Sequence, residues 1–310
     1  MTQRPLWRRP SPVLETLVDH IGRRTAGKPL VWVVDQPTED DLNHVVTEAT
    51  QPSQFDPLQL RATMLNRLAP FNSEGSNQPG KALMNQVKTG SARLVCYRCS
   101  LGKVIAIVEP GTDVPLEEWG RVFQAFGKGA DGKPWRLHPQ RRGNGKPWRI
   151  VWFANPTPRL FPEDGSAPTP ANLNGGYTYP CRPDTIVVYR KEEATRVLIH
   201  ELLHAACTDD MEISEAIRES LTETWAELFL VAVRARGSQR RAATLWRAQA
   251  QHIADQEAEL TRRGILGPGD FAWRYTVGRR PVLTTLGIEL PAPSPDPLTQ
   301  LQGSLAFTCP

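Results

Sequence analysis

Two histidines and a glutamate stand together in the sequence His-Glu-Leu-Leu-His at residues 200–204. Residues four apart on a helix project from the same face, so His200 and His204 can bind one metal ion through their imidazole nitrogens. Glu201 is rotated by about 100° from His200 around such a helix, near enough to take a proton from a water molecule beside the metal. The spacing therefore predicts a zinc site in which Glu201 is the general base.

A catalytic zinc ion needs a third protein ligand and an open position for water. Glu219, Glu223 and Glu227 recur at intervals of four residues and form one stripe on a predicted helix over residues 213–236. Glu223 follows His204 after 18 intervening residues, enough to end one helix, turn and return a carboxylate to the metal. Glu219 follows after only 14 residues, which requires a tighter turn, and it stays open as the alternative third ligand.

These features together resemble the gluzincin class of zinc metallopeptidases, the thermolysin-like and aminopeptidase-like enzymes. The resemblance rests on residues 200–204, on the 18-residue gap, and on the sequence Thr-Glu-Thr-Trp-Ala at residues 222–226. It implies one zinc ion with His200, His204 and Glu223 as ligands. It also implies a peptide or protein substrate.

The same resemblance implies roles for residues around the metal. Glu201 is the base, and Glu227 is a partner that orients a zinc-bound histidine. Zincin domains place an exposed edge strand before the zinc helix, and Gly175, Gly176 and Tyr177 fit that position, where free N–H and C=O groups can hold an extended peptide. Aminopeptidase-like members carry a glutamate in this segment, which has no acid here, so an endopeptidase is favoured. A glycine turn is the structural alternative.

Peptide hydrolysis also requires a hydrogen-bond donor for the developing oxyanion. Tyr275 is the residue assigned to this role, with Arg274, His252 and Tyr177 as alternatives. An aromatic cluster with a purely structural role is the competing interpretation of residues 271–275.

The elements that position these side chains predict an α+β fold. Its core is a zincin-like catalytic domain with a mixed sheet and an edge strand, followed by the zinc helix and the glutamate helix. The predicted division is an N-terminal α/β region of unknown role (1–80), the catalytic domain (81–290) and a Pro-rich tail (291–310). Predicted strands cover residues 30–34, 92–96, 103–108, 148–153, 176–179 and 185–189. Predicted helices cover residues 13–21, 115–126, 191–206, 213–236 and 239–263.

Composition excludes several classes of protein. The 310 residues carry a net charge of only +4, and no apolar run approaches the roughly 18 residues of a membrane span. The five cysteines are spaced irregularly and predict no disulfide framework. No secretory signal precedes the first predicted helix, so an intracellular, cytoplasmic location is expected. Oligomeric state is not constrained.

An alternative function comes from the basic segment 121–149, which holds eight Lys or Arg against one acid and repeats Gly-Lys-Pro-Trp-Arg. Such a segment can contact phosphates and stack on bases, although a solvated loop has the same composition. The alternative is therefore a binding or structural protein that contacts nucleic acid and keeps zinc as a structural ion. A third hypothesis keeps the zinc chemistry but has a non-peptide amide or ester as substrate.

Cys96 and Cys99 form a single C-x-x-C pair, which is weak support for a second zinc site.

Overall fold

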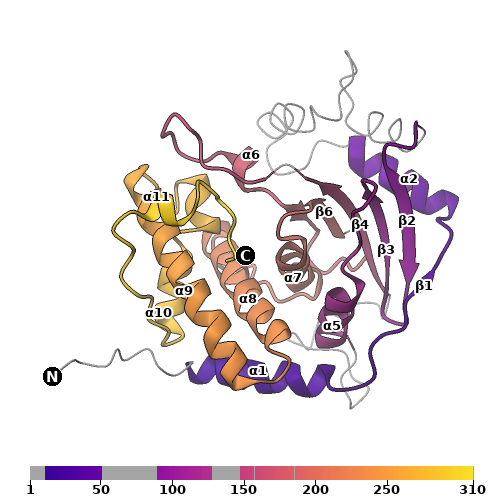
Figure 1. Cartoon of the computed structure of the whole chain (residues 1–310), viewed down its shortest axis with the longest axis horizontal. Coiled ribbons are helices and arrows are strands. Elements are labelled where there is room, and N and C mark those ends of the chain that lie inside the picture. Colours follow the sequence, from indigo (N-terminus) through magenta and orange to yellow (C-terminus); the bar gives the residue numbers. More distant parts are fainter. Residues whose placement is uncertain (1–10, 51–88, 128–146, 157, 185, 310) are drawn as a thin grey trace.

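A six-stranded mixed sheet forms one side of the fold in the computed structural model, on the right in Figure 1, and most of the C-terminal helices lie on the other side. The structure describes residues 11–50, 89–127, 147–156, 158–184 and 186–309. The predicted boundary at residue 80 and most of the basic segment 121–149 lie outside these ranges. In sheet order, the strands are β1 (Val33–Val34), β2 (Arg93–Arg98), β3 (Gly102–Val108), β4 (Trp148–Asn155), β6 (Ile186–Arg190) and β5 (Gly176–Tyr177).

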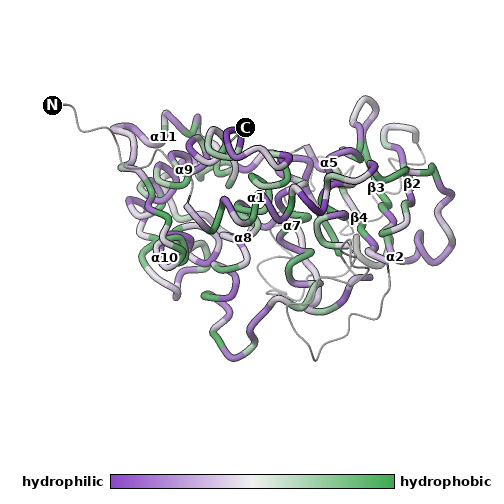
Figure 2. Tube along the Cα trace, turned by 90° about the horizontal axis from the view of Figure 1, so that it is seen from below, coloured by the Kyte–Doolittle hydropathy of each residue, from purple (hydrophilic) through white to green (hydrophobic). Residues whose placement is uncertain are grey.

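Parallel and antiparallel pairs occupy different parts of the sheet. The middle strands β3, β4 and β6 pair in parallel, whereas β1, β2 and β5 pair antiparallel to their neighbours. Strand β5 forms one edge, where Gly176 lies opposite Val188 and Tyr177 opposite Val187. The middle strands are nearly continuous hydrophobic runs, as expected for strands covered on both faces (Figure 2).

Helices cover both faces of this sheet (Figure 1). One face of the middle strands packs into a core with α1, α5, α7, α8 and α9, and the other packs against α2. Helix α1 thus shares the larger core, although it belongs to the predicted N-terminal region. The mixed α/β composition agrees with the predicted α+β class at a coarse level. The longer helices are α1 (Pro12–Thr25), α2 (Glu39–Thr50), α5 (Leu116–Phe126), α7 (Ala194–Ala205), α8 (Glu215–Ala235) and α9 (Gln239–Arg262).

Helix α7 carries the predicted zinc motif and is anchored from two sides. Trp119 on α5 donates from Nε1 to Oγ1 of Thr195 over 3.1 Å, and Thr195 donates in turn to Glu118 over 2.6 Å. The helix begins at Ala194, three residues later than predicted. Glu193, the residue before the helix, has a left-handed φ of 57° and makes no side-chain capping hydrogen bond, because its carboxylate turns inward to pair with Arg159.

A disulfide joins Cys181, between β5 and β6, to Cys207, just after α7. The expectation of free cysteines is therefore wrong for this pair, while Cys96, Cys99 and Cys309 are free thiols. The backbone N–H of Cys181 also donates to the carbonyl of His204 over 3.0 Å. The end of α7 is consequently held next to the segment that follows the edge strand.

Residues after α9 pack back onto the helices. They include the 3₁₀ helix η3 (Phe271–Tyr275), α10 (Arg279–Thr285) and α11 (Pro297–Gln300). Residues 301–309, here named the C-terminal strap, belong to the predicted Pro-rich tail, yet Leu305 and Phe307 are fully buried beside α9. Among the described helices, none combines the length and apolar character that a membrane span requires.

Candidate metal centre

Two histidines of α7 and one glutamate of α8 bring three ligand atoms to one buried point. Nε2 of His200 lies 3.0 Å from Nε2 of His204, and Oε2 of Glu219 lies 3.4 Å and 3.6 Å from these two nitrogens. Ligand atoms in a tetrahedral zinc site are about 3.3 Å apart, because each lies about 2.0 to 2.1 Å from the metal. The triangle therefore has the size that a bound metal ion requires, and this cluster could hold one.

The far nitrogen of each imidazole faces a carboxylate. Nδ1 of His200 lies 3.3 Å from Oε1 of Glu223, and Nδ1 of His204 lies 2.8 Å and 2.9 Å from the two oxygens of Asp209. A carboxylate at this position keeps the ring hydrogen on Nδ1 and leaves a lone pair on Nε2. Three lone pairs then converge in a buried space, which is unfavourable unless a cation lies between them. The donor set therefore fits a metal ion.

The charge state of the third ligand supports the same conclusion. Burial by itself raises the pKa of Glu219, but the charges that His204 and His200 carry when no metal is bound, and their hydrogen bonds, lower it well below the usual range. Glu219 is consequently ionised beside the two histidines, and a cation that replaces their protons would meet a carboxylate. An ionised carboxylate is the form that binds a divalent cation.

Helix α8 packs against α7 with Glu219, and not Glu223, beside the Nε2 atoms of the two histidines. The sequence predicts Glu223 as the third ligand and Glu219 as the alternative. In the structure Glu219 supplies the oxygen that faces both Nε2 atoms, while Glu223 faces the opposite nitrogen of His200. The turn between α7 and α8 is short enough to place Glu219 beside His204, because the second helix begins at Glu215.

The acid that contacts His204 is not the one that the sequence analysis expected to orient a histidine. Glu227, predicted to orient a histidine, is buried and accepts a hydrogen bond from Arg279. Burial raises the pKa of Glu227 to about 7, although Arg279 opposes this shift. Asp209 holds His204 instead, and the sequence interpretation missed it. The available signal was an acid five residues after His204, immediately past the end of the helix.

The predicted base and the predicted edge strand line the same pocket as the metal cluster. A Cβ atom at Gly176 would lie 3.2 Å from Oε1 of Glu201, so this carboxylate faces β5. That Cβ would also collide with the carbonyl oxygen of Val187 and approach Val197, which explains the glycine. Burial raises the pKa of Glu201 to about 7. The predicted residues that line this pocket are Gly175, Gly176, Tyr177, His200, Glu201, His204, Glu223 and Tyr275.

Tyr275 enters the pocket from η3, next to α8. Burial raises the pKa of its hydroxyl well above the usual value, so the group stays protonated and can donate a hydrogen bond. The alternatives are engaged elsewhere: Arg274 pairs with Glu215 over 2.7 Å, and Nε2 of His252 lies 2.8 Å from the carbonyl oxygen of Ala306. Of the four candidate donors, Tyr275 and Tyr177 therefore line the pocket of the metal cluster, and Arg274 and His252 do not.

Other predicted features do not contribute to this site. Cys96 and Cys99 belong to no cluster of metal-binding side chains within the described residues, and burial raises the pKa of Cys96 to about 11. Residues 128–146 of the basic segment lie outside the described chain.

Comparison of the chain with protein-family models, with curated proteins and with solved structures found no match. The function therefore has to be inferred from the arrangement of the site itself.

Proposed function

We propose that this protein is a zinc-dependent peptidase with a zincin-like arrangement of edge strand, zinc helix and glutamate helix. One observation carries the proposal. The buried nitrogens of His200 and His204 and the oxygen of Glu219 converge within 3.6 Å, beside Glu201 and the edge strand β5. Two histidines and one glutamate are a donor set that catalytic zinc sites use.

His200, His204 and Glu219 would hold the zinc ion, with Glu219 in place of the predicted Glu223. When bound, zinc would polarise the scissile carbonyl and lower the pKa of water toward about 7. Asp209 accepts a hydrogen bond from Nδ1 of His204, and the carboxylate of Glu223 lies 3.3 Å from Nδ1 of His200, so both imidazoles have a carboxylate that would orient them. Such carboxylate partners raise the basicity of the ligands.

Glu201 has the position and the proton affinity of a general base. Its pKa of about 7 lets the carboxylate take a proton from water and later deliver it to the leaving amine near neutral pH. The Tyr275 hydroxyl is placed to donate a hydrogen bond to the oxyanion. The exposed edge of β5 at Gly176 and Tyr177 offers backbone groups that would align an extended peptide.

The test compares Glu201→Gln with the wild-type protein. The amide keeps the volume of the side chain but cannot accept the proton, so we expect one zinc ion per chain and a loss of hydrolysis of at least about 100-fold. Metal content and cleavage of an unbiased peptide library give the two measurements. Glu212→Gln, on an exposed turn, is the matched control. Undiminished turnover in Glu201→Gln would refute the assignment, as would a zinc-loaded wild type that cleaves no peptide.

A further inference from the structure

Three buried arginines that the proposed chemistry does not use surround one aromatic ring of the C-terminal strap. Arg159, Arg196 and Arg279 are each at most 2% exposed. Their guanidinium carbons lie 5.0 Å, 4.6 Å and 5.6 Å from the centre of the Phe307 ring. Cations favour the electron-rich face of an aromatic ring, most strongly where water is excluded.

Each of these arginines lies against a glutamate carboxylate. The pairs are Arg159 with Glu193, Arg196 with Glu223, and Arg279 with Glu227, and Arg196 also lies 3.5 Å from the carboxylate of Glu193. Two nitrogens of Arg159, Nε and Nη2, have no hydrogen-bond partner within the described chain. The ring of Phe307 fills the space beside the three guanidinium groups.

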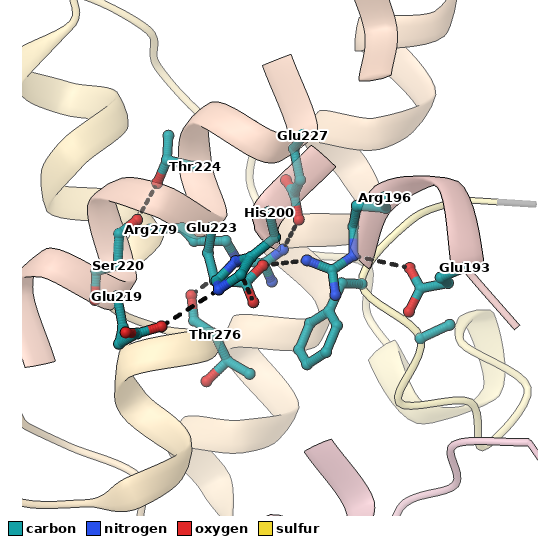
Figure 3. A network of polar contacts seen from close by, with 12 residues as sticks. Glu193, Arg196, His200, Glu219, Ser220, Glu223, Thr224, Glu227, Thr276 and Arg279 are labelled. Carbon is teal, nitrogen blue, oxygen red and sulfur yellow. Dashed lines mark hydrogen bonds and ion pairs between the residues drawn. The ribbon is translucent and has the colours of Figure 1, made fainter. Parts of the chain in front are cut away.

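One of these pairs reaches the metal cluster. Arg196 donates from Nη1 to Oε2 of Glu223, and the other oxygen of Glu223 faces Nδ1 of His200 (Figure 3). Arg196 and His200 are four residues apart on α7 and lie on the same face. The contacts thus form a chain from the ring of Phe307 through Arg196 and Glu223 to a proposed zinc ligand.

The strap is held by contacts that do not involve the ring. Gln249 donates to the carbonyl of Phe307 over 2.6 Å, and Gln256 donates to the carbonyl of Ala306 over 2.9 Å. The backbone N–H of Leu305 donates to the carbonyl of Arg159 over 2.9 Å. These hydrogen bonds fix the backbone of residues 305–307. The ring of Phe307 is therefore held in one position, and the arginines pack against it.

We infer that Phe307 and Arg196 are positioning residues for the metal site: the ring holds Arg196 on Glu223, and Glu223 in turn orients His200. The inference rests on the proposed function for the identity of the metal ligands. It gives the C-terminal strap a role in positioning the metal ligands, whereas the sequence analysis predicts only a Pro-rich tail there. Loss of the ring would let water reach Arg196 and loosen its contact with Glu223.

The test measures the dissociation constant of zinc by competition with a chromogenic chelator, without any peptide. Phe307→Leu removes the aromatic face but keeps an apolar side chain, and we expect an increase of about 10-fold. Arg196→Met should give an increase of about 10- to 100-fold, the range for loss of a group that orients a ligand. Phe161→Leu is the matched control, because its ring lies 4.8 Å from Arg263 in the same apolar cluster but away from the metal.

A double-mutant cycle separates positioning from general loss of stability. If the ring acts through Arg196, adding Phe307→Leu to Arg196→Met should change the zinc constant no further. Additive effects would overturn the inference, and so would a wild-type zinc constant in Phe307→Leu. Should Arg196→Met fail to fold, Arg196→Lys keeps a charge without the planar fork, and wild-type affinity in that variant would overturn the inference equally.

The two proposals fail in different ways. A wild type that binds zinc but cleaves no peptide refutes the peptidase and leaves this test intact. A wild type that binds no zinc overturns both.

Discussion

The register of α7 against α8 predicts which glutamate binds the metal, and paired substitutions test it. Glu219→Gln replaces the carboxylate whose Oε2 lies 3.4 Å and 3.6 Å from the two Nε2 atoms. Glu223→Gln changes a group that faces Nδ1 of His200, on the side away from the metal cluster, and that also pairs with Arg196. The amide keeps the volume of the side chain in both variants, but an amide oxygen is a much weaker zinc ligand than a carboxylate.

The expected magnitudes follow from the free energy of zinc binding. Structural sites with four ligands bind zinc with about 10 to 16 kcal/mol, so one ligand contributes about 2.5 to 4 kcal/mol. At about 1.4 kcal/mol per tenfold change, Glu219→Gln should weaken binding by at least about 60-fold. Glu223→Gln should weaken it by about 10-fold, the lower end of the range for a group that orients a ligand.

The assay is zinc competition, with the visible spectrum of the cobalt-substituted protein as a second readout. Only Glu219→Gln should change that spectrum strongly, because only this substitution alters the atoms bound to the metal. Glu212→Gln reports any general effect of removing a charge. A larger loss in Glu223→Gln than in Glu219→Gln would show that the ligand assignment is reversed.

Two further predictions concern stability. Cys207→Ser removes the disulfide to Cys181, which closes a loop of 26 residues. The substitution should lower the free energy of unfolding by about 3.5 kcal/mol. Urea denaturation measures this change, and a variant as stable as the wild type would contradict the prediction. Burial lowers the pKa of His252, so the unfolded chain binds more protons below its own pKa of about 6.5. The contribution of His252 to stability should therefore fall as the pH drops from 7 to 5, whereas the raised pKa values of Glu201 and Glu227 act in the opposite direction in both proteins. His252→Gln should therefore gain stability relative to the wild type over that interval, and an equal change in both proteins would contradict the role of His252.

The helices of the site were predictable from sequence because their signals are local. Helices α8 and α9 begin and end within two residues of the predicted ranges, 213–236 and 239–263. Their apolar residues recur at helical spacing, and glycine follows each helix within two residues. The convergence of the two histidines followed from the same local reasoning, whereas the edge strand beside them was an expectation from the family resemblance.

The choice between the glutamates was not available from spacing. Glu219 and Glu223 lie on one face of α8, and only the packing of this helix against α7 decides which one meets the Nε2 atoms. Periodicity within a helix says nothing about its register against a neighbour. The role of Asp209 depends likewise on the turn after α7, whose backbone is left-handed at Cys207 with φ 61°.

The strap escaped prediction for a different reason. Its buried residues are the short run Leu305, Ala306 and Phe307, which follows the Pro-rich residues 291–297 and is too short to show a periodicity. Their partners on α9 and α7 are distant in the chain. The disulfide has the same character, because the positions of Cys181 and Cys207 in the sequence carry no sign of their proximity.

The arginine cluster around Phe307 has a consequence for the order of folding. It draws together residues 159, 196, 279 and 307, and contacts of such long range form slowly because the loops between them must close first. The helices can form much earlier from local interactions. If residues 301–309 position His200 as inferred, a chain that has formed its helices but not yet docked this segment would hold His200 loosely, and we expect tight cation binding to appear last during folding.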